Sequence, residues 1–228
     1  MIRVIQRHCN FSSNSAHKER PEWFDREKIF DSFIETFTDE VDYVALFDSA
    51  SGDINNHFLS KKSVNIINID AGSETRSFVC ALQYAKAKQY DDKDIIYFVE
   101  DDYLHRNGWA NIMIEGFEHI GADYFTLYDH PDKYYLPMYE QLTSKVIATD
   151  NIHWRSTPST TCTFACRYET LNKYFDTHLE FCKGEYTRDH DMFTELWKKG
   201  SNLISCIPGY STHVESNMMS PLIDWSKV

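Results

Sequence analysis

Three consecutive carboxylates, Glu100, Asp101 and Asp102, directly follow a short apolar run at residues 95–99. Such a run, without Gly or Pro and ending in a turn, is typical of a buried central strand of an α/β sheet. Ligands of open α/β sheets bind beyond the carboxyl ends of the strands. Mg²⁺ or Mn²⁺ would relieve the repulsion between these acids and commonly shares its shell with a substrate diphosphate. A solvated acidic turn, or a helix capped by Asp102, explains the same residues.

Composition limits the classes of protein that fit. The chain has 228 residues, enough for one large domain with a substantial core. A hydrophobic content of 42% and an aromatic content of 15% are typical of a globular enzyme. The formal charge of −12 argues against a nucleic-acid partner, because binding a phosphate backbone requires clustered Lys and Arg.

No apolar stretch approaches the roughly 20 residues of a membrane span, and the first residues lack the apolar run of a signal peptide. We therefore expect a soluble, cytoplasmic protein without an integral membrane segment. The spacing of the six cysteines, at 9, 80, 162, 166, 182 and 206, fits neither a disulfide framework nor a zinc finger, so reduced thiols are expected.

Hydrophobic periodicity predicts alternating strands and helices. Strands are expected at residues 2–9, 42–47, 64–69, 95–99, 122–128 and 202–206, with one or two β segments in 152–166. Helices are expected within 20–37, 77–88, 111–120, 168–182 and 187–200. This alternation predicts βαβ units with parallel pairing. Residues 130–151 are rich in Tyr and Pro and could form an acceptor platform, and the residues after 206 are expected to form a tail.

Five stretches carry a resemblance to a known family: VALFDSASGD, DAGSETRSF, VEDD, TRDHDMFTELWKKG and YSTHVE. Together they resemble the GT-A fold of nucleotide-sugar glycosyltransferases, most closely the family 2 type. The resemblance implies an α/β domain over residues 1–228, with a mixed, mostly parallel Rossmann-like sheet flanked by helices. A donor half would end near residue 105, and an acceptor half would follow from about residue 106.

The resemblance also implies roles for the residues of the donor half. VEDD corresponds to the metal-binding DxD motif, although Val99 stands where a strict pattern has its first acid. The implied roles are metal binding for Asp102, metal or ribose binding for Asp101, support for Glu100, contact with the base or ribose for Asp48, and positions beside the donor for Gly72 and Arg76.

In the acceptor half, the resemblance places the catalytic base at Asp189, with Asp191 as the reserve. Arg188 replaces the Glu that precedes this base in the family pattern. A helix cap is the alternative role for Asp189. The resemblance makes His213 a late ligand of the metal or diphosphate, whereas an ordinary tail histidine is the alternative.

Two further predictions come from residue type. Arg7, at the end of the first predicted strand, is placed to meet the nucleotide. Aromatic side chains could stack on a sugar ring of the acceptor, and Trp154 and Tyr135 are the candidates, with Tyr134 and Tyr139 beside them. Core packing is the alternative for each of these aromatic residues.

These features predict a metal-dependent hexosyltransferase. It would use Mn²⁺ or Mg²⁺ to move a sugar from a nucleoside diphosphate, UDP-linked, to a glycan or glycoconjugate hydroxyl, with inversion if Asp189 is the base. A sugar-1-phosphate nucleotidyltransferase is the first alternative, but that class usually has a Gly-rich loop after the first strand, and residues 5–18 contain no glycine. A non-catalytic carbohydrate-binding module with a structural Ca²⁺ is the second.

Overall fold

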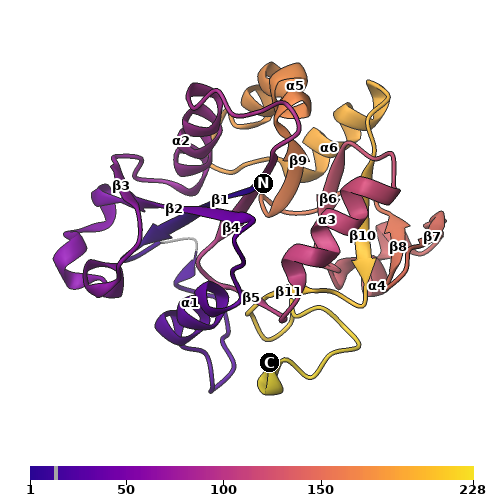
Figure 1. The fold of residues 1–228 in the computed structure, drawn as a ribbon. Helices are drawn as coiled ribbons and strands as arrows, with labels where there is room; N and C mark the ends of the chain where they lie inside the picture. The colour runs from indigo at the N-terminus through magenta and orange to yellow at the C-terminus, as the bar shows by residue number, and fades with distance from the viewer. Residues whose placement is uncertain (13–14) are drawn as a thin grey trace.

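The computed structural model describes residues 1–12 and 15–228. Within them, nine strands form one mixed sheet in the order β3-β2-β1-β4-β9-β6-β10-β8-β7 (Figure 1). The strands are β1 (Ile2–Cys9), β2 (Val41–Asp48), β3 (Ile66–Ile69), β4 (Ile95–Glu100), β6 (Tyr124–Thr126), β7 (Val146–Ala148), β8 (His153–Ser156), β9 (Phe164–Arg167) and β10 (Leu203–Ile207). The α/β fold class predicted from the sequence is confirmed.

Strand pairing in the sheet changes from parallel to antiparallel at β4. Strands β3, β2, β1 and β4 run parallel to one another, whereas β9 runs antiparallel to both β4 and β6. β10 pairs in parallel with β6, and β8 pairs antiparallel with β10 and β7. Since parallel strands end at one edge of the sheet, the carboxyl ends of β1, β2 and β4 meet there.

Helices cover both faces of the sheet (Figure 1). The α-helices are α1 (Arg26–Glu35), α2 (Glu74–Ala87), α3 (Trp109–His119), α4 (Asp132–Tyr135), α5 (Tyr168–Phe181) and α6 (Asp189–Lys198). Short 3-10 helices lie at Ser49–Ser51, Ile54–Asn56, Phe58–Lys61, Pro137–Tyr139 and Trp225–Lys227. Strand β4 shows how one run serves both faces: Tyr97 and Val99 pack with α1 and α3, while Ile96 and Phe98 pack with α2, α5 and α6.

A second, two-stranded sheet joins β5 (Tyr103–His105) to β11 (Ser211–His213). The strands are antiparallel, and His213 pairs with Tyr103 (Figure 1). The sequence alone predicts only a tail after residue 206, because a three-residue strand carries too little periodicity to be recognised. This pairing fixes the end of the chain beside the carboxylates that follow β4.

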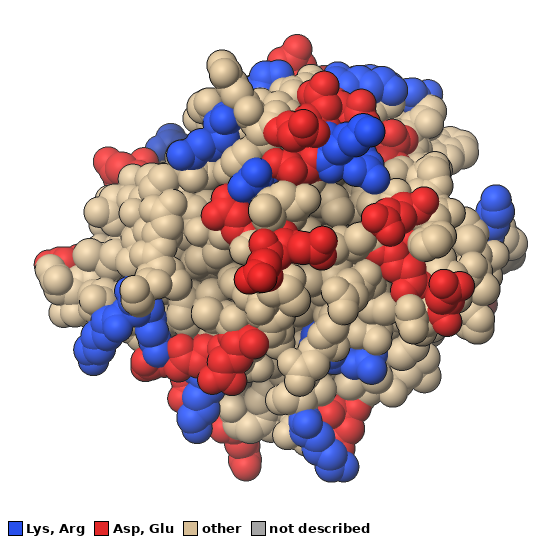
Figure 2. Space-filling view, in the orientation of Figure 1, with Lys and Arg blue, Asp and Glu red and all other residues tan. Residues whose placement is uncertain are grey.

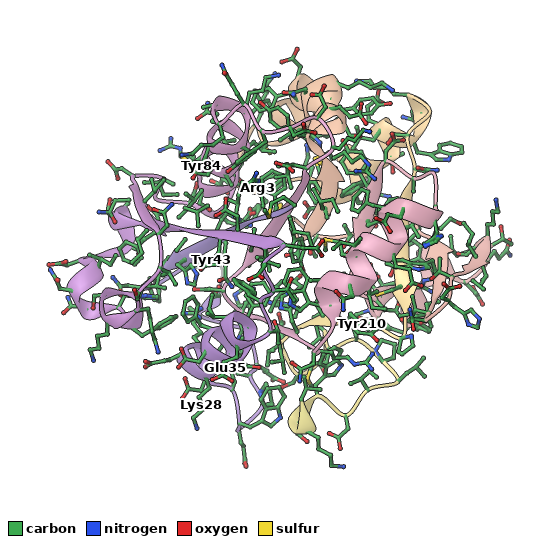
Figure 3. All side chains as sticks on the ribbon, in the orientation of Figure 1. Arg3, Lys28, Glu35, Tyr43, Tyr84 and Tyr210 are labelled. Carbon is green, nitrogen blue, oxygen red and sulfur yellow. The ribbon has the colours of Figure 1, made fainter. Side chains whose placement is uncertain are left out.

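Ion pairs also join the strands at the opposite edge of the sheet. Arg3, near the start of β1, donates to Asp94 at 2.9 Å and to Asp42 at 3.0 Å (Figure 3). On the face shown in Figure 2, acidic and basic side chains are interspersed. Within the described residues, no helix combines the length and the apolar character needed to span a bilayer.

Candidate active site

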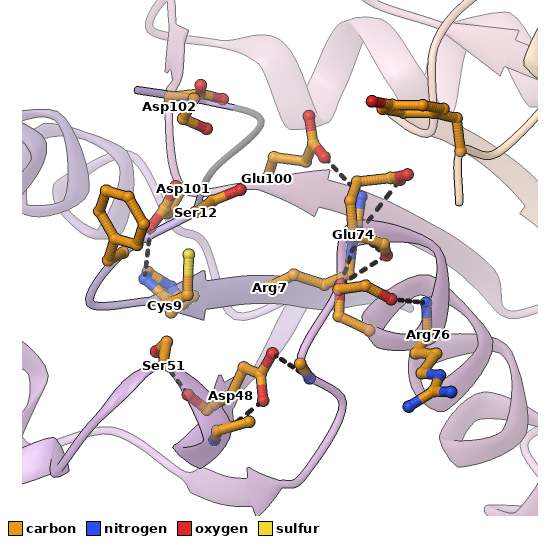
Figure 4. Close-up of a pocket in the computed structure, with 18 of the residues that line it drawn as sticks. Arg7, Cys9, Ser12, Asp48, Ser51, Glu74, Arg76, Glu100, Asp101 and Asp102 are labelled. Carbon is orange, nitrogen blue, oxygen red and sulfur yellow. Dashed lines mark hydrogen bonds and ion pairs between the residues drawn. The ribbon is translucent and has the colours of Figure 1, made fainter. Parts of the chain in front are cut away.

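A cavity of about 720 Å³ lies where β1, β2 and β4 end (Figure 4). Cys9 and Asp48, the last residues of β1 and β2, are register partners, and Arg7 of β1 pairs with Glu100, the last residue of β4. All four residues line the cavity, which brings the predicted donor-binding region into one place. The cavity is also lined by Gly72, Arg76, Asp101 and Asp102, as well as by Lys18 from the loop after β1.

The structure brings the two predicted metal ligands Asp102 and His213 together from distant parts of the sequence. His213 Nε2 lies 2.9 Å from Asp102 Oδ2. Arg20 donates to the same oxygen at 2.7 Å, and Lys18 Nζ lies 3.5 Å from it. Burial alone would raise the pKa of Asp102, but His213, Lys18 and Arg20 hold it well below its usual value.

The residues present at this point fit a divalent cation. Asp102 Oδ1 is buried and has no hydrogen-bond partner among the described residues. Nδ1 of His213 faces Glu215 at 3.5 Å, while Nε2 points toward Asp102, and a cation bound between the two residues would replace the proton on Nε2. A carboxylate oxygen and a neutral imidazole nitrogen form a donor set suited to Mn²⁺.

Asp101, the other predicted metal ligand, has different partners from Asp102. Its carboxylate lies 3.8 Å from His8 Nδ1 and 3.7 Å from Arg26 Nε. Burial raises the pKa of Asp101 to about 6, against the opposing effect of Arg26 and with a further rise caused by Asp102. His8, His57 and Asp101 offer ligand atoms within 4.8 Å of one another, a cluster that the sequence analysis missed.

Asp48 connects two turns at the cavity. Its carboxylate accepts hydrogen bonds from the backbone N–H groups of Ala71 and Gly72, both at 2.9 Å, and from that of Ala50 at 3.2 Å (Figure 4). Gly72 has a φ of +70°, which favours glycine, and it lies directly before the N-cap of α2. Arg76, in the first turn of α2, is exposed at the cavity, with no ion-pair partner among the described residues.

Arg7 lines the cavity but is largely buried. Its guanidinium donates to Glu100 at 2.6 Å and to Ser77 at 2.8 Å, and it lies 3.6 Å from Glu74 (Figure 4). Burial opposes the charge of Arg7, but Glu100 and Glu74 raise its pKa above the ordinary value. Arg7 therefore stays charged and holds Glu100, the first acid of the predicted motif, in a fixed position.

The two candidate bases lie in contrasting environments at the start of α6. Asp189 is partly buried and accepts a hydrogen bond from Cys162 Sγ at 3.0 Å. Burial raises its pKa to about 7; the bond from Cys162 opposes this rise, and the charge of Glu74 adds to it. Asp191 is exposed and lies 3.5 Å from Arg188. Only Asp189 has the perturbed environment typical of a catalytic acid or base.

The two predicted acceptor-stacking residues differ as well. Trp154 is fully buried and donates to Thr149 Oγ1 at 3.0 Å, while its ring packs against Phe125. This burial contradicts the prediction that Trp154 offers a face to a sugar, because its indole is needed in the core. Tyr135 is exposed and stays a candidate.

Sequence reasoning missed several charged or polar neighbours of the site. They are Lys18, Arg20, Arg26, His57, Glu74 and Cys162. The only signal for Lys18 and Arg20 was the density of basic residues in the loop after the first strand, which did not reveal their partners.

No family model and none of the curated proteins matches this chain in sequence. Solved structures do match its fold. The structure of GalNAc-T7 with UDP, GalNAc and Mn²⁺ has a TM-score of 0.60 at 10% identity, over 90% of this chain and 42% of that one. The structure of residues 1–349 of TarS from S. aureus, which has also been solved with UDP-GlcNAc, has a TM-score of 0.55 at 12% identity. The match covers 92% of this chain and 59% of that one.

A third structure shows that the fold serves another chemistry. The 4-diphosphocytidyl-2C-methyl-D-erythritol synthase from Anaerococcus prevotii has a TM-score of 0.51 at 10% identity, over 98% of this chain and 93% of that one. At such identities the similarity shows the fold alone, which is GT-A-like. This chain spans less than two thirds of the GalNAc-T7 and TarS chains.

Proposed function

We propose that this protein is a glycosyltransferase that moves a hexose-type sugar from a UDP-linked donor to a glycan or glycoconjugate hydroxyl. The observation that carries the proposal is the pairing of Asp102 with His213 at 2.9 Å, beside a cavity at the carboxyl ends of the parallel strands. A carboxylate and an imidazole at this edge are suited to a diphosphate held through a cation. The family 2 type of the GT-A fold is part of the proposal.

The donor half, about residues 1–105, would bind the nucleotide. Asp48 and Gly72 would meet the base or ribose, and Arg76, which is exposed and lines the cavity, would meet a phosphate. Arg7 would act by holding Glu100, and Asp101, which lines the cavity, would bind the metal or the ribose.

Asp102 and His213 would hold Mn²⁺, or alternatively Mg²⁺. When bound, such an ion supplies Lewis-acid stabilisation of the negative charge that grows on the leaving diphosphate. The imidazole of His213 favours manganese over magnesium. Lys18 and Arg20 lie against Asp102, and their positive charges would attract a diphosphate bound in the cavity.

In the acceptor half, Asp189 would take the proton of the acceptor hydroxyl as that oxygen attacks the anomeric carbon. Its pKa of about 7 lies near the pH at which a general base works best. A single displacement of this kind inverts the anomeric configuration. Asp191 is the reserve base, and Tyr135 would contact the acceptor.

Hydrolysis assays test this proposal against its nearest alternative. Slow release of UDP from UDP-sugars in the presence of Mn²⁺ is expected, with loss of release in Asp102→Asn and wild-type release in Asp176→Asn, a change at an exposed acid of α5 outside the cavity. Pyrophosphate release from a nucleoside triphosphate and a sugar phosphate would instead identify a nucleotidyltransferase. Retention of configuration in the NMR spectrum of the product would remove the base role from Asp189.

A further inference from the structure

Lys18 places its ammonium group against both proposed metal ligands. Its Nζ lies 3.1 Å from His213 Nε2 and 3.5 Å from Asp102 Oδ2. A divalent ion held by this pair would lie beside His213 Nε2 and Asp102 Oδ2, in the space that the ammonium group of Lys18 occupies. The ammonium group and the ion therefore compete for one position.

The orientation of His213 supports this competition. Nδ1 faces Glu215 Oε2 at 3.5 Å, and Nε2 faces Asp102 Oδ2 at 2.9 Å, so two carboxylates fix the direction of the ring. The ring of Tyr103 stacks on the imidazole with 5.3 Å between centroids and 23° between planes, which restrains the imidazole. The imidazole is thus held with Nε2 toward Asp102 and Lys18, and the ammonium group of Lys18 is the cation that the chain itself places there.

The local charge balance opposes simultaneous occupancy. Asp102 is buried and already faces the positive charges of Lys18 and Arg20. Solvent screening is weak at such a site, so a third cationic group would be strongly repelled. Lys18 also lines the cavity, and its long flexible stem allows the ammonium group to turn toward an anion there.

We propose that Lys18 is a tethered counter-cation that couples metal binding to nucleotide binding. Without a nucleotide, Lys18 occupies the position beside Asp102 and His213. A diphosphate in the cavity attracts the ammonium group and frees the position for the divalent ion. This inference rests on the proposed function, and linkage requires each ligand to tighten the binding of the other by the same factor.

Mn²⁺ titrations followed by electron paramagnetic resonance test the coupling, with and without UDP. Lys18→Gln should bind Mn²⁺ more tightly than the wild type in the absence of UDP, by roughly 5- to 150-fold, the usual range of coupling between sites. The tightening caused by UDP should shrink in this variant. Lys28→Gln, a change at an exposed lysine of α1 (Figure 3), should match the wild type. UDP binds Mn²⁺ by itself, so the test compares the effect of UDP on Mn²⁺ affinity between the wild type and Lys18→Gln.

Equal Mn²⁺ affinity of Lys18→Gln and wild type without UDP would overturn the inference, as would the absence of Mn²⁺ binding to both. Asp102→Asn should abolish tight Mn²⁺ binding in the wild type and in Lys18→Gln, and this loss would show that the ion binds at Asp102. Lys18→Met provides a second neutral variant, and melting curves verify the fold. If Lys18→Gln binds Mn²⁺ more tightly but UDP binds to neither protein, the competition holds and the proposed nucleotide donor is wrong.

Discussion

Replacing Asp189 by Asn should remove the proposed base while leaving its shape. The carboxylate has a pKa of about 7 because it is buried, with the thiol of Cys162 opposing the rise. In the wild type, about one tenth of the molecules carry an ionised Asp189 at pH 6 and about nine tenths at pH 8. The value of kcat/KM should therefore fall about tenfold for each pH unit below 7.

Asp189→Asn should lower kcat about 10²- to 10⁴-fold, the usual contribution of a general base. It should also abolish the acid limb of the pH–rate profile, the fall in kcat/KM below pH 7. Cys162→Ala removes a hydrogen bond that stabilises the ionised carboxylate, so the limb should move to higher pH. UDP release with a saturating acceptor, measured from pH 5 to 9, provides both readouts.

The same pKa has a consequence for folding. The folded form of Asp189 binds its proton more tightly than the unfolded chain does, so this group lowers stability as the pH rises from about 4 to 7. Each unit of pKa difference corresponds to about 1.4 kcal/mol. Asp189→Asn should thus melt at a higher temperature than the wild type at pH 8, and at a similar temperature at pH 4.

Asp191→Asn is the matched control, because this acid is exposed and lies two residues further along the same helix. Its pH profile and melting temperature should match those of the wild type. If Asp189→Asn kept the wild-type pH limb and kcat, the base assignment would be wrong. If only Asp191→Asn lost activity, the reserve would become the base.

Two further predictions concern the framework of the site. A Cβ added at Gly116 would lie 2.9 Å from Phe125 and 3.0 Å from Trp154. Gly116→Ala should therefore lower the free energy of unfolding by about 1–3 kcal/mol, measured by urea titration. Unchanged stability would show that α3 can shift to make room. Arg7→Gln leaves Glu100 without its partner at 2.6 Å, so the free energy of unfolding should fall by about 3 kcal/mol. UDP binding should also weaken. Full stability in this second variant would show that Arg7 is not needed to hold Glu100.

Local patterns in the sequence determined much of the fold. The apolar run before Glu100 predicted a buried strand, and β4 is that strand, with its side chains alternating between the two faces. The periodicity of residues 77–88 predicted a helix, and α2 is that helix, although it begins three residues earlier, at Glu74, with Ser73 as its N-cap. Periodicity and capping act over a few residues, so a sequence can show them directly.

The tertiary structure alone decided which distant side chains meet. His213 reaches Asp102 because β11 pairs with β5, and Lys18 reaches the same pair through a loop without periodicity. Trp154 was mistaken for a surface aromatic because only packing against Phe125 reveals its burial. Contacts between residues more than 100 positions apart depend on how all the elements pack together, and no local stretch of the sequence contains that information.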